Sequence, residues 1–451
     1  MSEELENEIA GFRELLEKRD MHALREFLSP INEVDIALMI ENTGRDESAL
    51  VFRLLPKEIA ADVFANLPIE RQQDLIEAFS DQEVVEMINL LYVDDAVDLL
   101  EEMPANFVQR VLRQVDSTRR KVINHFLRYE DGSAGSLMTA EMIHLRSEMT
   151  VGEAIRRIRD HGEHCEIIDT GYVTLPDRVL EGYISLRTLL TSSDDELVGD
   201  LMDIDVISAR TNDDQEKVAH LFSRYDLLSL PVVDNENRLV GIITIDDVVD
   251  VIQEEATEDI ERMAAIVPTE ESYMRTGAWV QARHRVGWLL FLMLSGILNG
   301  VILQRYESAF LAMPILVSFV PMLTGTGGNS GAQSSTLVIR GLSLNEITPR
   351  DFFKVFWKEF RVSLIVSAVL GTVNFLQIGL RNEHNWMLAL TVSLALSAIV
   401  VIAKLVGGTL PLLAKKLRLD PAILASPLIT TIVDAIGLIV YFGVATLLLP
   451  I

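Results

Sequence analysis

The spacing of apolar residues divides the chain into three kinds of sequence. Residues 1–130 repeat apolar positions with the period of an α-helix and contain few glycines, which predicts an acidic, all-α superhelical N-terminal domain. From Met138 onward, short β-type apolar runs alternate with helical segments. Beyond Arg285 the apolar runs become long enough to cross a lipid bilayer. The pattern therefore predicts a multidomain membrane protein in which helical, α/β and transmembrane domains follow one another.

Two similar segments of the N-terminal domain lie 36 residues apart. LLPKEIAADVFANLP ends at Pro68, and LLYVDDAVDLLEEMP ends at Pro104. A period of this length is typical of stacked helix pairs. Asp94, Asp95 and Asp98 in the second segment fall within about one helical turn. They are either a solvated surface or ligands for a divalent cation.

The α/β region, residues 131–250, contains two related units. LEGYISLRTLL at 180–190 and LVGIITIDDVV at 239–249 share a strand–turn–helix form at a spacing of 59 residues. This repetition predicts tandem βαβ-type units at about 138–200 and 201–250. In the second unit we expect a strand at 206–208 and a helix around 216–223.

A connecting segment, residues 246–270, leads from the α/β domain to the transmembrane domain at 271–451. Residues 246–266 contain neither proline nor glycine, which predicts one continuous helix. Its acidic residues are Asp246, Asp247, Asp250, Glu254, Glu255, Glu258 and Asp259. Like charges four residues apart on a helix repel each other. The helix is therefore expected to bind a divalent cation, the alternative being Lys or Arg side chains from elsewhere.

Five apolar stretches are predicted to span the membrane: residues 286–303, 310–339, 362–380, 386–413 and 426–449. Lys and Arg concentrate before the first stretch, between the second and third, and between the fourth and fifth. Cytoplasmic loops carry such an excess of positive residues. The rule places the N-terminal domains in the cytoplasm and the C-terminus outside the cell membrane.

The last stretch carries one charge, Asp434. A carboxylate inside hydrocarbon costs roughly 2.5–3.5 kcal/mol, so such residues face a protein interior or a water-filled path. Ser426, Thr430 and Asp434 lie four residues apart and share one helix face. An oxygen-lined face suits a hard cation such as Mg²⁺ or Ca²⁺, whereas the alternative is a neutral Asp in an interhelical hydrogen bond.

Other polar residues in the membrane half form weaker patterns. The second stretch continues as TGTGGNSGAQSS, whose small residues allow close helix approach or line a watery cavity. DFFKVFWKEFR at 351–361 is predicted to lie at the inner membrane interface. Asn374 and Lys404 are single polar residues within spans, and Lys404 is expected to extend toward the inner face.

Charge is distributed unevenly between the two halves. Residues 1–282 contain 26 Lys and Arg against 60 Asp and Glu, whereas residues 283–451 contain 13 against 7. The acidic half would repel nucleic acid and attract cations. The single cysteine, Cys165, excludes an intrachain disulfide. The N-terminus has no signal-peptide core and reads as mature sequence. No nucleophile–base pair or metal-hydrolase motif is found, so an enzyme is not predicted.

The α/β repeat resembles the CBS domain, most clearly through PVVD and LVGIIT in its second copy. A tandem CBS pair implies one regulatory module with a cleft between its halves. By resemblance this cleft is a candidate site for ATP or another adenine nucleotide. A purely structural pair that binds no nucleotide is the alternative.

The order of domains, together with PMLTGTGGNSGAQSS and DPAILASPLITTIVDAIGLIVYF, resembles the MgtE family of magnesium channels over essentially the full chain. The resemblance implies a homodimer that takes up Mg²⁺, with Mn²⁺ and Co²⁺ as further candidate ions. It places the ion path between the second and fifth spans and implies closure by cytosolic Mg²⁺ bound between soluble domains. It makes Asp434 the pore carboxylate, with Thr430 and Ser426 lining the path beneath it and Asp420 near the cytoplasmic mouth. At the position of Ser426 the family often has Asn. The acidic residues of the N-terminal domain and of the connecting helix are of the type that forms the family's regulatory Mg²⁺ sites.

Two other functions fit the same domain order. A CBS-regulated divalent-cation carrier or exporter would couple flux differently from a channel. A non-transporting sensor would use only the acidic domains and would leave Asp434 unexplained.

Overall fold

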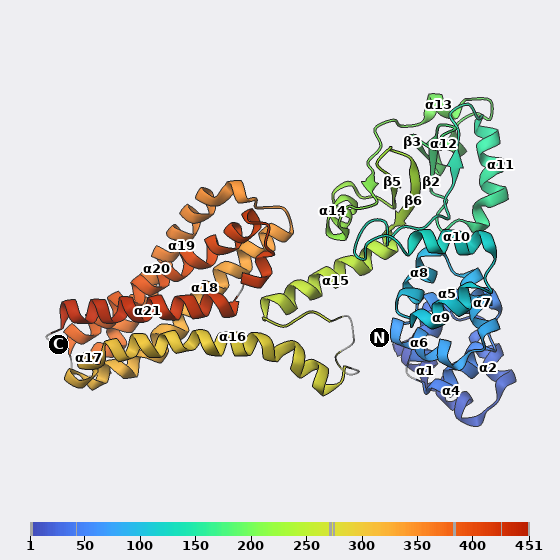
Figure 1. Cartoon of the computed structure of the whole chain (residues 1–451). Helices are drawn as coiled ribbons and strands as arrows, with labels where there is room; N and C mark the ends of the chain where they lie inside the picture. Colours follow the sequence, from blue (N-terminus) through green and yellow to red (C-terminus); the bar gives the residue numbers. More distant parts are fainter. Residues whose placement is uncertain are drawn as a thin grey trace. The chain divides into compact units, whose positions relative to one another are not determined.

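The computed structural model describes residues 3–449, apart from 42, 270–272, 274–275, 382–384 and 425. The chain divides into two compact units, Met1–Ile252 and Gln253–Ile451. Figure 1 shows helices throughout the first part of unit 1, strands only in its second part, and long helices in unit 2. The predicted fold class, a helical domain, an α/β pair and a helical transmembrane region, is confirmed.

The first part of unit 1 is a stack of short helices. The described helices are α1 Glu3–Lys18, α2 Met21–Leu28, α3 Glu33–Glu41, α4 Arg45–Phe52, α5 Lys57–Ala65, α6 Ile69–Ala78, α7 Asp81–Leu90, α8 Val93–Glu101, α9 Ala105–Leu112 and α10 Ser117–Phe126. Alternate helices contact each other, α3 with α5, α5 with α7 and α6 with α8, which is the arrangement of a superhelix. Pro68 and Pro104 cap α6 and α9, so the 36-residue repeat corresponds to a repeated turn.

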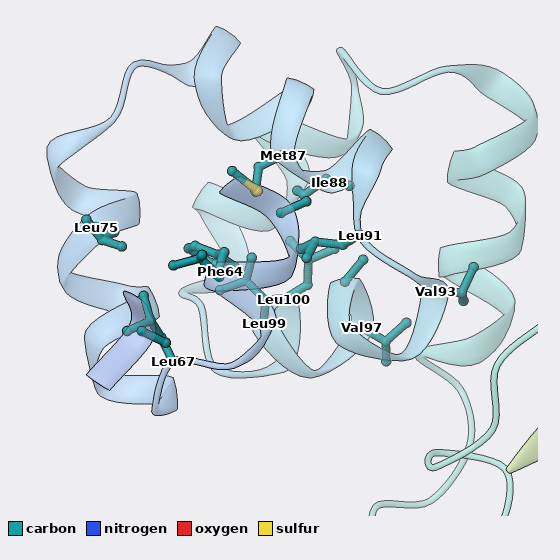
Figure 2. Packing of buried hydrophobic residues seen from close by; sticks show 14 of the residues in the cluster. Phe64, Leu67, Leu75, Met87, Ile88, Leu91, Val93, Val97, Leu99 and Leu100 are labelled. Atoms are coloured by element: carbon teal, nitrogen blue, oxygen red, sulfur yellow. The ribbon is translucent and has the colours of Figure 1, made fainter. Parts of the chain in front are cut away.

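A continuous apolar core holds this stack together. Figure 2 shows Phe64 at its centre with Met87 and Ile88 of α7 and Leu99 and Leu100 of α8 around it. The apolar face of α8 is buried here, and Asp94 and Asp95 occupy the first turn of the helix. Packing of the apolar face thus fixes where the acidic residues of α8 lie.

The second part of unit 1 contains two similar three-stranded sheets. The first repeat comprises β1 His144–Leu145, α11 Val151–His161, β2 Thr170–Thr174, β3 Leu180–Ser185, α12 Leu186–Thr191 and α13 Val198–Leu201. The second comprises β4 Ala209–Arg210, α14 Gln215–Tyr225, β5 Ser229–Val233, β6 Leu239–Thr244 and α15 Ile245–Met263.

In each repeat the first strand pairs parallel with the second, and the second pairs antiparallel with the third. The strand expected at 206–208 lies instead at Ala209–Arg210, because these residues pair with Val232 and Val233. The Tyr172 and Ser229 hydroxyls lie 2.7 Å apart and join the repeats.

The connecting helix is present as α15, which ends at Met263 rather than at Ile266. Its first turn contains Asp246 and Asp247, and Val248 and Val251 are buried in the core of unit 1. The residues of α15 from Gln253 onward belong to unit 2.

Unit 2 is built from long helices. They are α16 Ala278–Arg305, α17 Glu307–Ala312, α18 Val320–Ser343, α19 Phe352–Arg381, α20 Trp386–Lys416 and α21 Ser426–Leu448, with short 3-10 turns η2 Pro314–Phe319, η3 Pro349–Asp351 and η4 Pro421–Leu424. Helices α18, α20 and α21 contact one another, and α19 packs on α20. Four described helices are long and apolar enough to cross a membrane: Ala278–Arg305, Pro349–Arg381, Trp386–Lys416 and Pro427–Leu448.

The prediction of one continuous helix at 310–339 was wrong. The chain there forms α17 and η2 before α18 begins at Val320, since Pro314 starts the 3-10 turn. Helix α18 has 24 residues, about 36 Å of helix, which is enough to cross a bilayer. Its Gly, Ser and Thr residues make it less apolar than the other four long helices.

The basic stretch at 351–361 is not a separate loop or helix, and its location at the inner membrane interface stays a prediction. Residues 352–361 are the first turns of α19, and Val355, Glu359 and Ser363, spaced four apart, form a buried stripe. Lys404 does not extend toward water either, for only 5% of it is exposed. Asn374 donates a hydrogen bond to Ser393 Oγ at 3.2 Å.

Candidate metal centres

Three carboxylates from separate segments of unit 1 come together. Asp94 lies in the first turn of α8, Glu166 in the loop before β2, and Asp247 in the first turn of α15. Each offers an oxygen, and these oxygens all lie within 4.8 Å of one another. Hard divalent cations such as Mg²⁺ and Ca²⁺ bind oxygen ligands of this kind. The three residues, hereafter the carboxylate cluster, are therefore a candidate metal centre.

The local structure leaves the carboxylate cluster short of proton donors. Asp94 Oδ1 accepts a hydrogen bond from the Asp95 amide at 3.0 Å. Thr244 Oγ1 lies 2.8 Å from Glu166 Oε1 and 2.7 Å from Asp247 Oδ2. Because a hydroxyl carries one proton, it can donate to only one of these carboxylates at a time. Glu166 Oε2 has no hydrogen-bond partner among the residues with described placement.

Burial and mutual repulsion raise the pKa of these acids. Desolvation is the main cause, and it raises the pKa of Glu166 to about 8 and that of Asp247 to about 6. For Asp94, burial and then the charge of Glu166 raise the pKa well above its usual range. Burial is also the main cause that raises the pKa of the neighbouring Asp95 to about 7 and the pKa of Asp98 to about 8. A cation between the carboxylates would replace the protons that Asp94 and Glu166 otherwise tend to retain near neutrality.

The equivalent position in the other repeat has different chemistry. Ser185 and Arg187 occupy the β3–α12 turn where Thr244 and Asp246 occupy the β6–α15 turn. They line a cavity of about 500 Å³. Its remaining lining residues include Asp169, Tyr172, Tyr183, Asp205, Tyr225, Asp226 and Ser229. The tyrosine rings and Arg187 suit an aromatic ligand with an anionic group, and the three Asp carboxylates can accept hydrogen bonds from hydroxyl or amino groups of such a ligand.

In unit 2, the end of α15 binds the ends of two other helical segments. Asp259 accepts a hydrogen bond from Ser343 Oγ, the last residue of α18, at 2.7 Å. Arg262 forms ion pairs with Glu258 and with Asp420, which lies just before η4. Asp420 also accepts a hydrogen bond from the Ala422 amide at 2.8 Å. The end of the connecting helix is thus attached to the end of α18 and to the segment that leads into α21.

Helices α18 and α21 pack through glycines. A Cβ atom on Gly328 would lie 2.8 Å from Thr430 Cγ2, and one on Gly331 would lie 2.8 Å from Ile429 Cγ2. Only glycine permits this approach. One turn above Thr430, the Oδ1 atom of Asp434 is buried, and it has no hydrogen-bond partner among the described residues. An unpaired carboxylate oxygen inside a helical bundle is a candidate cation ligand.

Comparisons with known proteins agree with this architecture. A family model for a divalent cation transporter, MgtE, matches residues 320–444, and one for the MgtE intracellular N domain matches 31–132. CBS domain models match 134–195 and 198–254. The magnesium transporter MgtE of Thermus thermophilus is 38% identical over 444 residues, which cover 97% of this chain and 98% of that protein. This chain belongs to the MgtE family.

Other relatives give the same result. The magnesium transporter MgtE of Bacillus subtilis is 33% identical and covers 94% of each chain. The soluble part of a magnesium transporter has a TM-score of 0.53 at 30% identity, over 56% of this chain and 99% of that chain. The cytosolic domain of the Mg²⁺ channel MgtE in complex with ATP has a TM-score of 0.52 at 37% identity, over 54% of this chain and 99% of that chain. The predicted membership of the MgtE family is confirmed.

Within this MgtE-family fold, the structure brings together some of the predicted site residues. Asp94 and Asp247 lie in the carboxylate cluster, and Asp95, Asp98, Asp246 and Asp250 are sequence neighbours outside it. Glu258 and Asp259 have protein partners, Arg262 and Ser343. Glu254 and Glu255 also interact within the protein. The Ser426 side chain lies outside the described residues.

Glu166 was not predicted from the sequence, because the segment EIID at 166–169 lies beside no run of acidic residues that would mark it as a cation ligand. The 59-residue repeat could have revealed it. In each repeat the turn after the third strand faces the segment before the second strand of the other repeat, as the contact between Thr244 and Glu166 illustrates.

Proposed function

We propose that the protein is a Mg²⁺ channel that mediates Mg²⁺ uptake across the cell membrane and is closed by cytosolic Mg²⁺. The observation that carries the proposal is the carboxylate cluster, which joins the helical domain, the first CBS repeat and the connecting helix through Asp94, Glu166 and Asp247. The relatives named above are magnesium transporters, which supports Mg²⁺ as the ion.

Regulation follows from electrostatics. Without a cation, three close carboxylates destabilise the docking of α8 and Glu166 against the start of α15, unless they retain protons. Mg²⁺ bound among them favours the docked arrangement. An ion shifts such an equilibrium only by its differential affinity for the two arrangements, and several weak sites acting together shift it more steeply than one. Cytosolic Mg²⁺ would therefore act as the closing signal.

The connecting helix transmits this signal. Helix α15 is continuous from Asp246 in the first unit to Arg262 in the second. Its last turns contact Ser343 at the end of α18 and Asp420 in the segment that leads into α21. Release of the first turn of α15 would loosen these contacts and open the path between α18 and α21.

Ion conduction is assigned to the face of α21 that carries Thr430 and Asp434, with Ser426 and Asp420 toward the cytoplasmic side. In a homodimer, two copies of Asp434 on the symmetry axis would form a carboxylate ring. Mg²⁺ loses its water reluctantly, so one carboxylate per chain with neutral oxygens suits the hydrated ion. The N-terminal domains are proposed to lie in the cytoplasm, because the loops next to them are basic.

The cavity around Arg187 is proposed to bind ATP or another adenine nucleotide. Arg187 would pair with phosphate, and the tyrosines of the lining would stack on the base. The structure of a family member's cytosolic domain in complex with ATP supports this assignment. Nucleotide and Mg²⁺ would then use the two equivalent turns of the CBS pair.

A recording of channel open probability against cytosolic Mg²⁺ tests the proposal. Glu166→Gln should shift closure to higher Mg²⁺, because it removes one ligand and one charge from the carboxylate cluster. Glu163→Gln is the matched control, since Glu163 is exposed in the same loop. An unchanged Mg²⁺ dependence in Glu166→Gln would contradict the assignment of the regulatory site.

A further inference from the structure

A carboxylate, a hydroxyl and an ammonium group meet between three helices of unit 2. They belong to Glu359 of α19, Ser334 of α18 and Lys404 of α20, and their exposed fractions are 8%, 1% and 5%. Ser334 Oγ lies 2.6 Å from Glu359 Oε2, and Lys404 Nζ lies 3.5 Å from Ser334 Oγ. Neither charge is used by the ion path or by the regulatory site described above.

The hydrogen bonds have one consistent direction. The Lys404 ammonium can only donate, so it donates to Ser334 Oγ, and the Ser334 hydroxyl then donates to the Glu359 carboxylate. The hydroxyl therefore bridges a positive and a negative charge. Burial of either charge alone would be costly, whereas a pair connected in this way is compensated.

Glycines hold the backbones close around this polar network. A Cβ atom on Gly408 would lie 2.7 Å from Glu359 Cγ, so α20 leaves space for the Glu359 side chain. A Cβ atom on Gly407 would lie 2.2 Å from the carbonyl oxygen of Gly331, so α18 and α20 are in backbone contact. Helix α18 is thus fixed on the side that faces α19 and α20.

The same helix forms the contact with α21. Gly328, which meets Thr430, precedes Ser334 by six residues, about 9 Å along a helix. A shift or rotation of α18 at Ser334 would move Gly328 against Thr430. The polar network would therefore affect the distance between α18 and α21 beside the proposed ion path. None of its members lies on α21.

We propose that Glu359, Ser334 and Lys404 are positioning residues that fix α18 against α19 and α20 and so set the ion selectivity of the path along α21. The inference rests on the proposed channel function. It assigns to two buried charges a function in discrimination between Mg²⁺ and a larger divalent ion, and not in ion binding.

The first measurement is thermal unfolding of the full-length protein in detergent. Glu359→Gln and Lys404→Met each leave one buried charge without its counterpart, so each should lower the unfolding temperature. The double variant Glu359→Gln/Lys404→Met should regain most of the loss, because both charges are gone. A double variant as unstable as the sum of the two single variants would overturn the charge coupling.

The second measurement is divalent-ion flux into liposomes with Mg²⁺ or Ca²⁺. The double variant and Ser334→Ala should conduct, with a ratio of Mg²⁺ to Ca²⁺ flux about tenfold lower than wild type, which corresponds to about 1.4 kcal/mol. Asn374→Ala is the matched control, because it removes a buried polar contact between α19 and α20 that does not involve α18. It should lower stability and leave the flux ratio unchanged.

The outcomes separate the two proposals. A wild-type flux ratio in both the double variant and Ser334→Ala would overturn the selectivity function while leaving the channel function in place. Absence of divalent flux through the wild-type protein would instead overturn the proposed function. An equal loss of selectivity in Asn374→Ala would show that general loosening of the helices, and not the polar network, is the cause.

Discussion

Buried carboxylates have different surroundings in the two units. In unit 1, Asp94, Glu166 and Asp247 share one space, with a single hydroxyl between two of them. In unit 2, Glu359 has its own hydroxyl and ammonium partners, Ser334 and Lys404. Under the proposed function, the first arrangement would gain stability from an added divalent ion, whereas the second has its counter-charge within the protein. The two proposals thus assign the same residue type to a switch in one unit and to a fixed support in the other.

Asp434 lies between these two cases. Its Oδ1 atom has no hydrogen-bond partner in the described part of the chain, and Asp434 belongs to no group of three or more metal-ligating side chains among the same residues. One carboxylate is a weak site for a dehydrated divalent ion but suffices to attract a hydrated one. The comparison therefore predicts that the carboxylate cluster, Asp434 and Glu359 differ in how strongly they depend on an added cation. Variants of the protein can test this difference.

The largest effect is expected for Asp434→Asn. The change removes the only charge of α21 and should abolish Mg²⁺ flux while leaving expression and unfolding temperature near those of wild type, because a neutral residue is easier to bury. Mg²⁺ uptake into liposomes is the measurement. Glu346→Gln, in an exposed loop, is the control. Normal uptake by a well-folded Asp434→Asn protein would contradict the assignment of Asp434 as the pore carboxylate.

A second large effect concerns Mg²⁺ and the stability of unit 1. At a Mg²⁺ concentration about 100 times the dissociation constant, one site adds about 2.7 kcal/mol to the free energy of unfolding. We expect Glu166→Gln to reduce this gain. In the presence of a chelator it should also raise the unfolding temperature above about pH 8, where the Glu166 carboxyl is charged and repels its neighbours. Calorimetry with and without Mg²⁺ measures both. A variant with lower stability in chelator and the full Mg²⁺ gain would indicate that Glu166 is only structural.

The pH dependence of this gain should be of intermediate size. The folded-state pKa values of Glu166 and Asp247 are raised to about 8 and about 6, so the stability contributed by their protonated forms is lost as pH rises through those values. Without Mg²⁺, unit 1 should thus become less stable as pH rises from about 4, the pKa of these carboxyl groups in the unfolded chain, to about 8, the folded-state pKa of Glu166. Mg²⁺ competes with these protons, so its stabilising effect should grow over the same range. A Mg²⁺ gain that is constant with pH would contradict the cluster as the binding site.

The sequence predicted those features that depend on local period. Helices, strands and the 59-residue repeat follow from the spacing of apolar residues, and Asp94 and Asp247 stand out because they lie in acidic runs on helices. Asp434 stands out because it is the one charge in an apolar stretch. Apart from the repeat, each of these signals is contained within about twenty residues of chain.

The features that were missed depend on contacts between distant residues. Glu166 approaches Thr244 across 78 positions of sequence, and nothing near Glu166 marks it as a ligand. Glu359 was predicted to lie in an interfacial segment, because its neighbours in sequence are basic. Its partners Ser334 and Lys404 lie in other helices and could not be recognised from the local pattern. The break before α18 was missed because the apolar run continues through Pro314 without a change in hydropathy. Local pattern gives the elements, and tertiary packing decides which polar groups meet.

The smallest effect is expected where the protein already supplies the cation. Arg262 pairs with Glu258 and Asp420, and its side chain is 33% exposed, so solvent weakens both pairs. Arg262→Gln should release the end of α15 from Asp420 and raise the Mg²⁺ concentration needed for closure by a few-fold, which corresponds to a coupling of about 1 kcal/mol. Open probability against cytosolic Mg²⁺ measures this shift. Arg262→Lys keeps the charge and should lie between wild type and Arg262→Gln. If Arg262→Gln closes at the same Mg²⁺ concentration as wild type, the attachment of α15 to Asp420 does not transmit the signal, and the contact between Asp259 and Ser343 would be the one to test.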